Sequence, residues 1–205
     1  MGAFTLIDQL TFYGSYHHNK WNQLIHFVFV PTIIWSACVW LTYTGPLLPG
    51  DAWASHTSWL PPVLQGVAEP NAALVVLLAY TAFYIKLDVF AGVSWALTTG
   101  LTVWLSSTAF RMTVPHAWAW AILVQFVSWV MQIWPGHYVL EKRKPALFDS
   151  MFQAFALAPL FVWFEALFLL GYRPELYAEL QIRVEEELKK LKAGPKQPLL
   201  GATKK

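Results

Sequence analysis

Charged residues and cysteine are both scarce in this 205-residue chain. Only 13% of its residues are charged and 57% are hydrophobic, whereas an ordinary soluble domain has about 25% charged residues. This composition excludes a typical soluble protein and indicates a polytopic membrane protein. The single cysteine, Cys38, excludes an intramolecular disulfide and a cage of thiolate ligands. A net charge of +2 gives no indication of a nucleic-acid partner, so the expected surroundings are a lipid bilayer.

Two other signals are missing. The first ten residues include Asp8 and lack a basic run followed by an apolar core, so we expect membrane insertion to rely on internal segments. The chain also lacks the Gly-x-Ser-x-Gly pattern of a serine lipase.

Long apolar stretches are what the sequence does contain. Residues 24–43, 72–85, 89–110 and 117–134 are uncharged, and about 20 such residues can cross a bilayer. We predict an all-α membrane bundle with about four full crossings. A fifth stretch, 152–170, is interrupted by a proline and a glutamate, so we predict that it is re-entrant or buried within the bundle.

The distribution of charge predicts the orientation. Residues 45–71 contain no Lys or Arg, whereas basic residues border the other ends of the predicted crossings, so both termini should be cytosolic. Prolines and glycines in 45–71 predict a loop without regular elements. Residues 175–192 have the spacing of an amphipathic helix, suited to lipid contact or self-association. We therefore divide the chain into a membrane-embedded domain, 1–172, and a segment, 173–205, made of this amphipathic helix and a disordered cytosolic tail.

Histidines gather just before the first apolar stretch. Asn19 is a suitable N-cap, and a helix beginning after it would place Asn22 and His26 one turn apart on the same face. His17 and His18 would lie in the preceding loop, from which they could fold over that face.

A second polar pair follows the fourth apolar stretch. His137 and Glu141 are also four residues apart, so both could reach one ion from a single helix. Imidazoles with a carboxylate suit iron, zinc or copper rather than calcium. Glu141 could instead form a surface ion pair with Lys142 or Arg143.

Together these blocks resemble the 2-hydroxy fatty acid dioxygenases, a family of endoplasmic-reticulum membrane proteins. The matching positions are 12–19, 22, 24–26 and 30–32, and then 129, 132, 136–137, 141–147, 149, 153, 157–159, 164–165, 169 and 171–172. The likeness reaches to about Leu176. One departure is an extra residue, with Pro135, between Gln132 and His137. It would either rotate Gln132 away from the site or be absorbed by a local bulge or kink.

The resemblance implies an Fe(II)-dependent α-oxidation, in which a 2-hydroxy long-chain fatty acid and O2 give an acid one carbon shorter and carbon dioxide. It suggests His17, His26 and His137 as iron ligands, with His18 or Glu141 as a fourth.

Supporting roles are also implied by the resemblance. Tyr16 and Asn22 would orient the imidazoles. Lys20, Lys142 or Arg143 would neutralise the carboxylate of the substrate.

Several alternatives stay open. The histidines could form a structural cluster in a non-enzymatic lipid-binding scaffold or transporter, or they could hold zinc in a lipid hydrolase. The expected location is the endoplasmic-reticulum membrane, or the inner membrane if the source is bacterial. The chain could also form a homo-oligomer.

Overall fold

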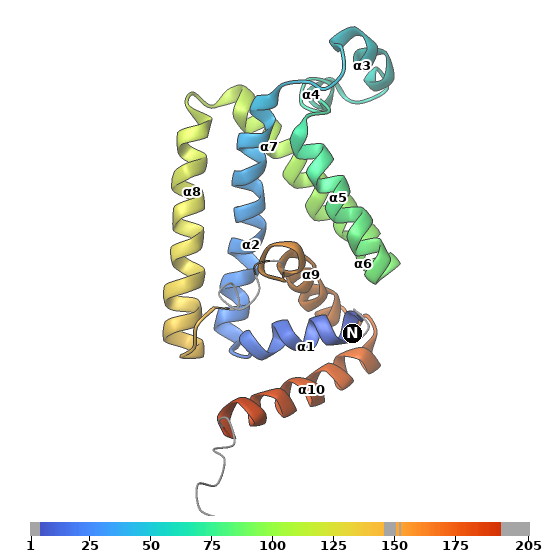
Figure 1. Ribbon diagram of the computed structural model, residues 1–205. Helices are drawn as coiled ribbons and strands as arrows, with labels where there is room; N and C mark the ends of the chain where they lie inside the picture. The colour runs from blue at the N-terminus through green and yellow to red at the C-terminus, as the bar shows by residue number, and fades with distance from the viewer. Residues whose placement is uncertain (1–4, 146–150, 152, 194–205) are drawn as a thin grey trace, which may run out of the picture.

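The computed structural model describes residues 5–145, 151 and 153–193, and these are helical with no strand. The first helices of the chain are α1 (Leu6–Tyr16), α2 (Lys20–Leu41) and the 3-10 turn η1 (Thr42–Thr44), followed by α3 (Gly50–Thr57) and α4 (Pro62–Gln65). Next come α5 (Ala72–Leu87), α6 (Val89–Trp95), the π-helical turn η2 (Ala96–Gly100), α7 (Leu101–Thr113) and α8 (Ala117–Met131). The last are the π-helical η3 (Gln132–Glu141) and η5 (Gln153–Leu157), then α9 (Ala158–Leu169) and α10 (Pro174–Ala193). Figure 1 shows α2, α5, α7 and α8 running lengthwise, with α1 and α10 across one end.

The prediction of an all-α membrane bundle is confirmed. Three helical stretches of the described chain are long and apolar enough to cross a membrane, namely Lys20–Thr44, Val89–Thr113 and Ala117–Glu141. Ala72–Leu87 and Ala154–Leu169 are apolar but shorter. At a rise of about 1.5 Å per residue, α5 spans roughly 24 Å, less than the roughly 30 Å of a hydrocarbon core. That α5 completes a fourth crossing stays a prediction.

A polar break turns the chain sharply between α5 and α6. The Asp88 carboxylate accepts a hydrogen bond from the Ala91 N–H at 2.9 Å and so caps α6. Gly92 lies so close to α5 that an added Cβ would stand 2.5 Å from the backbone nitrogen of Ile85. Arg173, at the start of the tail, binds Asp88 at 2.7 Å. The hairpin is therefore fixed at its turn from two directions.

The opposite end of the bundle contains two short helices where none was predicted, and that prediction was wrong. Pro49 is the residue before α3, and Pro62 is the first residue of α4. Proline is compatible with the first turn of a helix, because the N–H that it lacks has no partner there.

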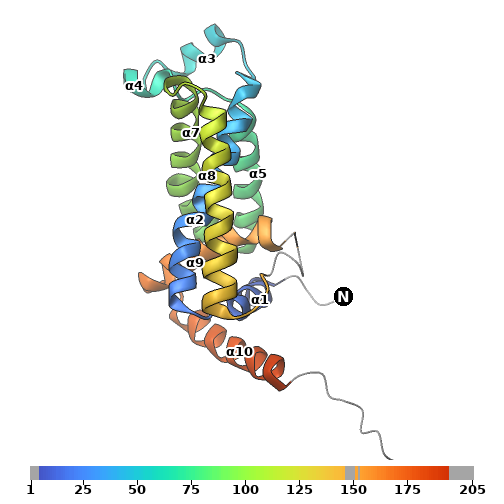
Figure 2. The same cartoon turned by 90° about the vertical axis from the view of Figure 1, so that its left-hand side faces the viewer.

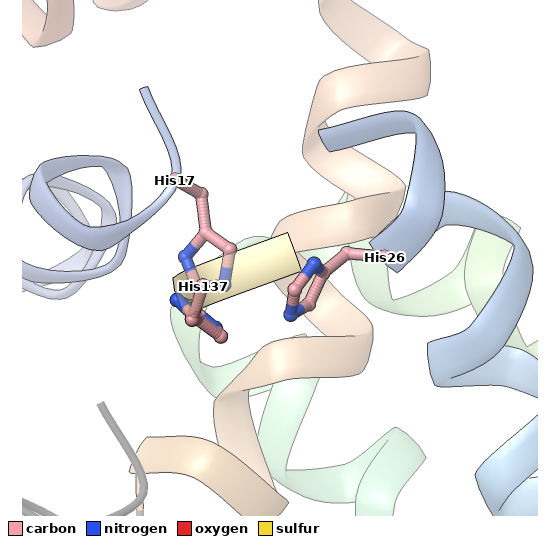
Figure 3. Close-up of side chains that lie close together, drawn as sticks. All are labelled: His17, His26 and His137. Atoms are coloured by element: carbon pink, nitrogen blue, oxygen red, sulfur yellow. The ribbon is translucent and has the colours of Figure 1, made fainter. Parts of the chain in front are cut away.

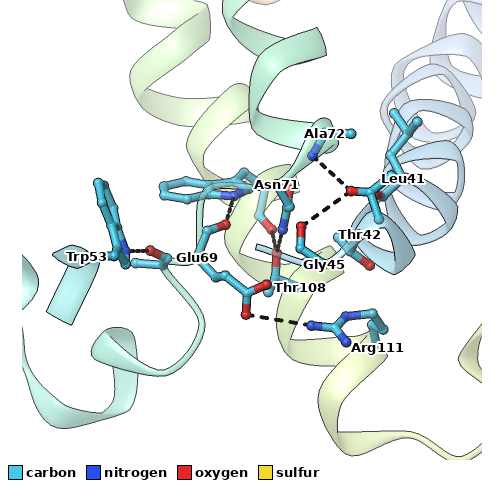
Figure 4. Close-up of polar contacts among 12 residues, drawn as sticks. Leu41, Thr42, Gly45, Trp53, Glu69, Asn71, Ala72, Thr108 and Arg111 are labelled. Carbon is cyan, nitrogen blue, oxygen red and sulfur yellow. Dashed lines mark hydrogen bonds and ion pairs between the residues drawn. The ribbon is translucent and has the colours of Figure 1, made fainter. Parts of the chain in front are cut away.

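Polar contacts join the helices at this end (Figure 4). The Asn71 amide donates to the Thr108 hydroxyl at 3.1 Å, and both side chains are buried. Arg111 pairs with Glu69 at 3.7 Å. These contacts hold the start of α5 against α7.

Helices α1 and α10 lie together at the histidine end, as both views show (Figure 2). The amphipathic helix predicted in the tail is confirmed as α10. Its apolar side includes the buried Leu180 and Val184, and Val184 lies against Gly14 of α1. That side therefore packs on the protein itself, whereas the sequence suggested lipid contact or self-association.

Candidate metal centre

Three histidines from three different elements meet at the α1 end of the bundle (Figure 3). His17 directly follows α1, His26 lies in the second turn of α2, and His137 lies in η3. One ring nitrogen of each lies within 4.8 Å of the others, and all three residues are buried. The convergence expected from the sequence is therefore present.

Backbone carbonyls orient two of the three rings. The Nδ1 atom of His17 is 2.9 Å from the Tyr13 carbonyl oxygen, and the Nδ1 atom of His26 is 3.0 Å from that of Asn22. A ring that donates its Nδ1–H in this way presents the lone pair of Nε2, the arrangement typical of metal-bound histidines. The buried Nε2 atom of His17 and Nδ1 atom of His137 have no hydrogen-bond partner among the described residues.

Burial also favours the metal-binding form of His17. It lowers the pKa of the His17 imidazole well below 6.5, and the nearby His26 and His137 rings lower that pKa further. The ring is therefore neutral at physiological pH, and neutral imidazole is the form that binds metals. Three close, buried nitrogen donors fit a borderline metal ion such as iron or zinc.

The extra residue near Pro135 is absorbed by a π-helix. The segment from Gln132 to Glu141 is π-helical. A hydrogen bond in a π-helix joins residues five apart rather than four apart as in an α-helix, so the hydrogen-bonded turn accommodates one extra residue. Gln132 stays buried and lines the same cavity as His137. The extra residue is therefore absorbed by a local bulge and does not rotate Gln132 away from the site.

A carboxylate ties the start of α2 to η3. The Glu141 Oε1 atom accepts hydrogen bonds from the Asn19 N–H at 2.8 Å and from the Asn22 amide at 3.0 Å. The Asn22 side chain is fully buried, and an added Cβ on Gly136 would stand 2.5 Å from its Oδ1 atom. Glu141 is absent from the group of potential ligands formed by the described residues. It connects the two elements that carry His26 and His137.

The other predicted site residues lie around this cluster. His18, Lys20 and Lys142 are exposed. Arg143 donates to the carbonyl oxygen of Ser15 at 2.5 Å, and Tyr16 is half-buried with its ring 5.0 Å from that of Phe12. Neither His18 nor Glu141 joins the three imidazoles. Arg143 is therefore in contact with the end of α1.

Tyr13 belongs to the site although no role was assigned to it from the sequence. Its ring stacks on His17 with centroids 3.8 Å apart and planes 14° apart. Its hydroxyl is buried without a partner among the described residues. The signal was its position four residues before His17, about one helical turn back along the chain.

A largely apolar cavity begins at the histidines and follows α2, and we call it the α2 cavity. It contains about 1030 Å³ of empty space, including its open part. From α2 it is lined by His26, Val30, Ile33, Ile34, Ala37, Cys38 and Leu41; its other walls include Tyr13, His17, Val76, Tyr80, Gln125, Trp129, Gln132 and His137. The three histidines therefore lie at one end of a hydrophobic space.

Comparison with known proteins gives one family. The family model described as "2-hydroxy-palmitic acid dioxygenase Mpo1-like" matches residues 3–170. The chain belongs to this Mpo1-like family. It is 33% identical over 193 residues to the 2-hydroxy-palmitic acid dioxygenase MPO1 of Saccharomyces cerevisiae, covering 93% of this chain and 96% of the yeast protein. No solved structure matches the chain. The family match includes all three histidines and ends before α10.

Proposed function

We propose that this chain is an iron-dependent dioxygenase that removes C1 from 2-hydroxy long-chain fatty acids. The observation that carries the proposal is the group of three buried imidazoles at one end of an apolar cavity. The Mpo1-like family and the name of the yeast relative support it.

The overall reaction balances without another reductant. A 2-hydroxy acid and O2 give the acid one carbon shorter, carbon dioxide and water, so the substrate supplies the four electrons that reduce O2. Neither 2-oxoglutarate nor a nicotinamide is required. Bound Fe(II) would supply the O2 chemistry that amino-acid side chains lack.

The protein would hold the metal and position the substrate. His17, His26 and His137 would be the ligands. Glu141 and Asn22 would keep α2 and η3 in register, so that the imidazoles stay together. Arg143, which contacts the Ser15 carbonyl oxygen beside the cluster, carries a charge that would favour a carboxylate on the substrate.

Elemental analysis and oxygen consumption test this proposal. Protein loaded anaerobically with Fe(II) should retain about one iron per chain, as expected for one three-histidine site, and should consume O2 with 2-hydroxypalmitate. His26→Ala should lose both properties. His56→Ala is the matched control, because His56 is exposed on α3, outside the cluster.

The alternatives give different results. Stoichiometric zinc and ester hydrolysis would identify a lipid hydrolase. A chain that binds no metal and consumes no O2, yet folds normally, would be a scaffold or transporter.

We also propose an endoplasmic-reticulum membrane location with both termini cytosolic. The support is that the basic Lys20, Lys86 and Lys142 occur at the same ends of the apolar helices as α1 and α10. Protease protection of tags placed at each terminus in sealed microsomes tests the orientation, and protection of either tag would contradict it.

A further inference from the structure

The polar groups of the α2 cavity are distributed unevenly. Away from the histidines they are satisfied within the protein, and the Tyr80 hydroxyl donates to the Phe155 carbonyl at 3.0 Å. The Gln132 amide, one π-helical turn from His137, donates to the Ser128 carbonyl at 3.3 Å. Gln125 is likewise hydrogen-bonded, to the Ser36 hydroxyl. This part of the cavity therefore offers a ligand mainly apolar contacts.

At the histidine end the opposite holds. Within the described part of the chain, the cavity-lining residues that have a buried polar atom without a partner are Tyr13 (its hydroxyl), His17 (Nε2) and His137 (Nδ1). An unpartnered buried polar atom is costly, and a ligand with a polar head would remove that cost. The cavity thus suits an amphipathic ligand whose head lies at the histidines and whose chain follows α2.

The length of the cavity can be measured along α2. The lining residues His26, Val30, Ala37 and Leu41 recur at helical spacing on one face. With a rise of about 1.5 Å per residue, Ala37 lies roughly 16 Å from the level of His26 and Leu41 roughly 22 Å. A long acyl chain reaches about 15 Å, because two opposed leaflets make a hydrocarbon core of roughly 30 Å. The end of such a chain would therefore lie near Ala37.

Helix α5 provides the facing wall at this depth. The Ala72 N–H donates to the Thr44 hydroxyl at 3.3 Å, which aligns the start of α5 with the end of α2. Because the two helices run in opposite directions (Figure 1), Val76 lies about one turn further along, near the level of Leu41. Ala37 is a small residue of α2, one turn closer to the histidines than Leu41 and Val76.

We propose that Ala37 and Leu41 set the length of the acyl chain that this protein accepts, with Ala37 leaving room for the final carbons and Leu41 lining the far end. The inference rests on the proposed function for the identity of the head group. It adds that chain-length selectivity resides in the C-terminal part of α2, at the opposite end of this helix from His26.

The test uses saturated 2-hydroxy acids lengthened one carbon at a time from 2-hydroxyoctanoate to 2-hydroxystearate. Both kcat/KM of the iron-loaded protein and equilibrium binding to the metal-free protein are measured. Each methylene that enters the cavity should increase affinity about fourfold, which corresponds to roughly 0.8 kcal/mol. The increase should stop at the length that fills the cavity.

Two variants move this limit in opposite directions. Ala37→Phe should stop the increase at a shorter acid and leave the shortest acids unaffected, whereas Leu41→Ala should extend it to a longer one. Val28→Phe is the control, because Val28 lies on the same helix but is exposed on the opposite face. If Ala37→Phe does not fold, the Leu41→Ala profile decides.

The outcomes separate the two proposals. Wild-type turnover with limits unchanged in both variants would overturn the chain-length assignment and leave the dioxygenase intact. Absence of turnover in the wild type would overturn the dioxygenase, and the binding profiles would still decide the chain-length assignment. Shifted limits in the two α2-cavity variants, with a normal Val28→Phe profile, would support it.

Discussion

Gly136→Ala is the substitution whose effect on the histidine cluster can be worked out most directly. The new methyl group would stand 2.5 Å from the Asn22 Oδ1 atom, whereas ordinary van der Waals contact begins at 3.4 Å, so the amide must move by about 0.9 Å. Asn22 is fully buried, and its amide donates to Glu141 at 3.0 Å. Overpacking of this kind costs roughly 1–3 kcal/mol, and losing a hydrogen bond to a charged acceptor costs roughly 1.5–3 kcal/mol more.

The displaced amide should also disturb metal binding. The backbone carbonyl oxygen of the same residue, Asn22, lies 3.0 Å from the His26 Nδ1 atom, and groups that orient a metal ligand typically change affinity about 10–100-fold when altered. Anaerobic titration with Fe(II), together with thermal unfolding, measures both effects. Gly66→Ala is the control, because nothing lies within 4 Å of a Cβ there. An unchanged iron affinity in Gly136→Ala would refute the idea that Asn22 positions the cluster.

Three further predictions concern stability and the role of the carboxylate. Gly92→Ala should lower the free energy of unfolding by at least roughly 1–3 kcal/mol, because its Cβ would meet the backbone of Ile85 rather than a movable side chain; a melting temperature equal to wild type would contradict this. Asp88→Ala should cost about 1–2 kcal/mol through loss of the α6 cap, with Asp88→Asn retaining most of that stability in calorimetry. Glu141→Ala should weaken iron binding about 10–100-fold, whereas Glu141→Gln should keep most of the affinity, because the amide oxygen can still accept both hydrogen bonds. Equal losses in these two Glu141 variants would instead identify the carboxylate as a metal ligand.

The features that depend on short stretches of chain could be predicted from the sequence. Asn19 as an N-cap is a local signal, and α2 begins directly after this residue. The Asn19 side chain accepts a hydrogen bond from the Trp21 N–H at 2.9 Å. The placement of Asn22 and His26 one turn apart on the same face follows from their positions in this helix. Apolar stretches of the required length predicted the membrane-capable helices, because hydrocarbon thickness fixes how many residues a crossing needs.

Contacts between distant parts of the chain were harder to predict. Glu141 was considered as a metal ligand or a surface ion pair, but it binds Asn22, which is 119 residues away in the sequence. Helical spacing from His137 could not show this, because η3 is π-helical and its side chains project at other angles than in an α-helix. The packing of α10 on α1 is a similar case. The periodicity predicted an apolar face but not the surface that covers it.

The position of the three histidines relative to the cavity follows from a single element. Helix α2 provides both His26 and one whole wall of the α2 cavity, so the distance from the imidazoles to any lining residue is fixed by the helical rise. His17 and His137 come from elements attached to the first turns of α2, through the loop after α1 and through Glu141. A substitution further along α2 can therefore change how long a ligand fits without moving the imidazoles. A substitution at Asn22 or Gly136 acts on the imidazoles and leaves the cavity length unchanged. This separation is why metal affinity and chain-length preference should respond to different variants.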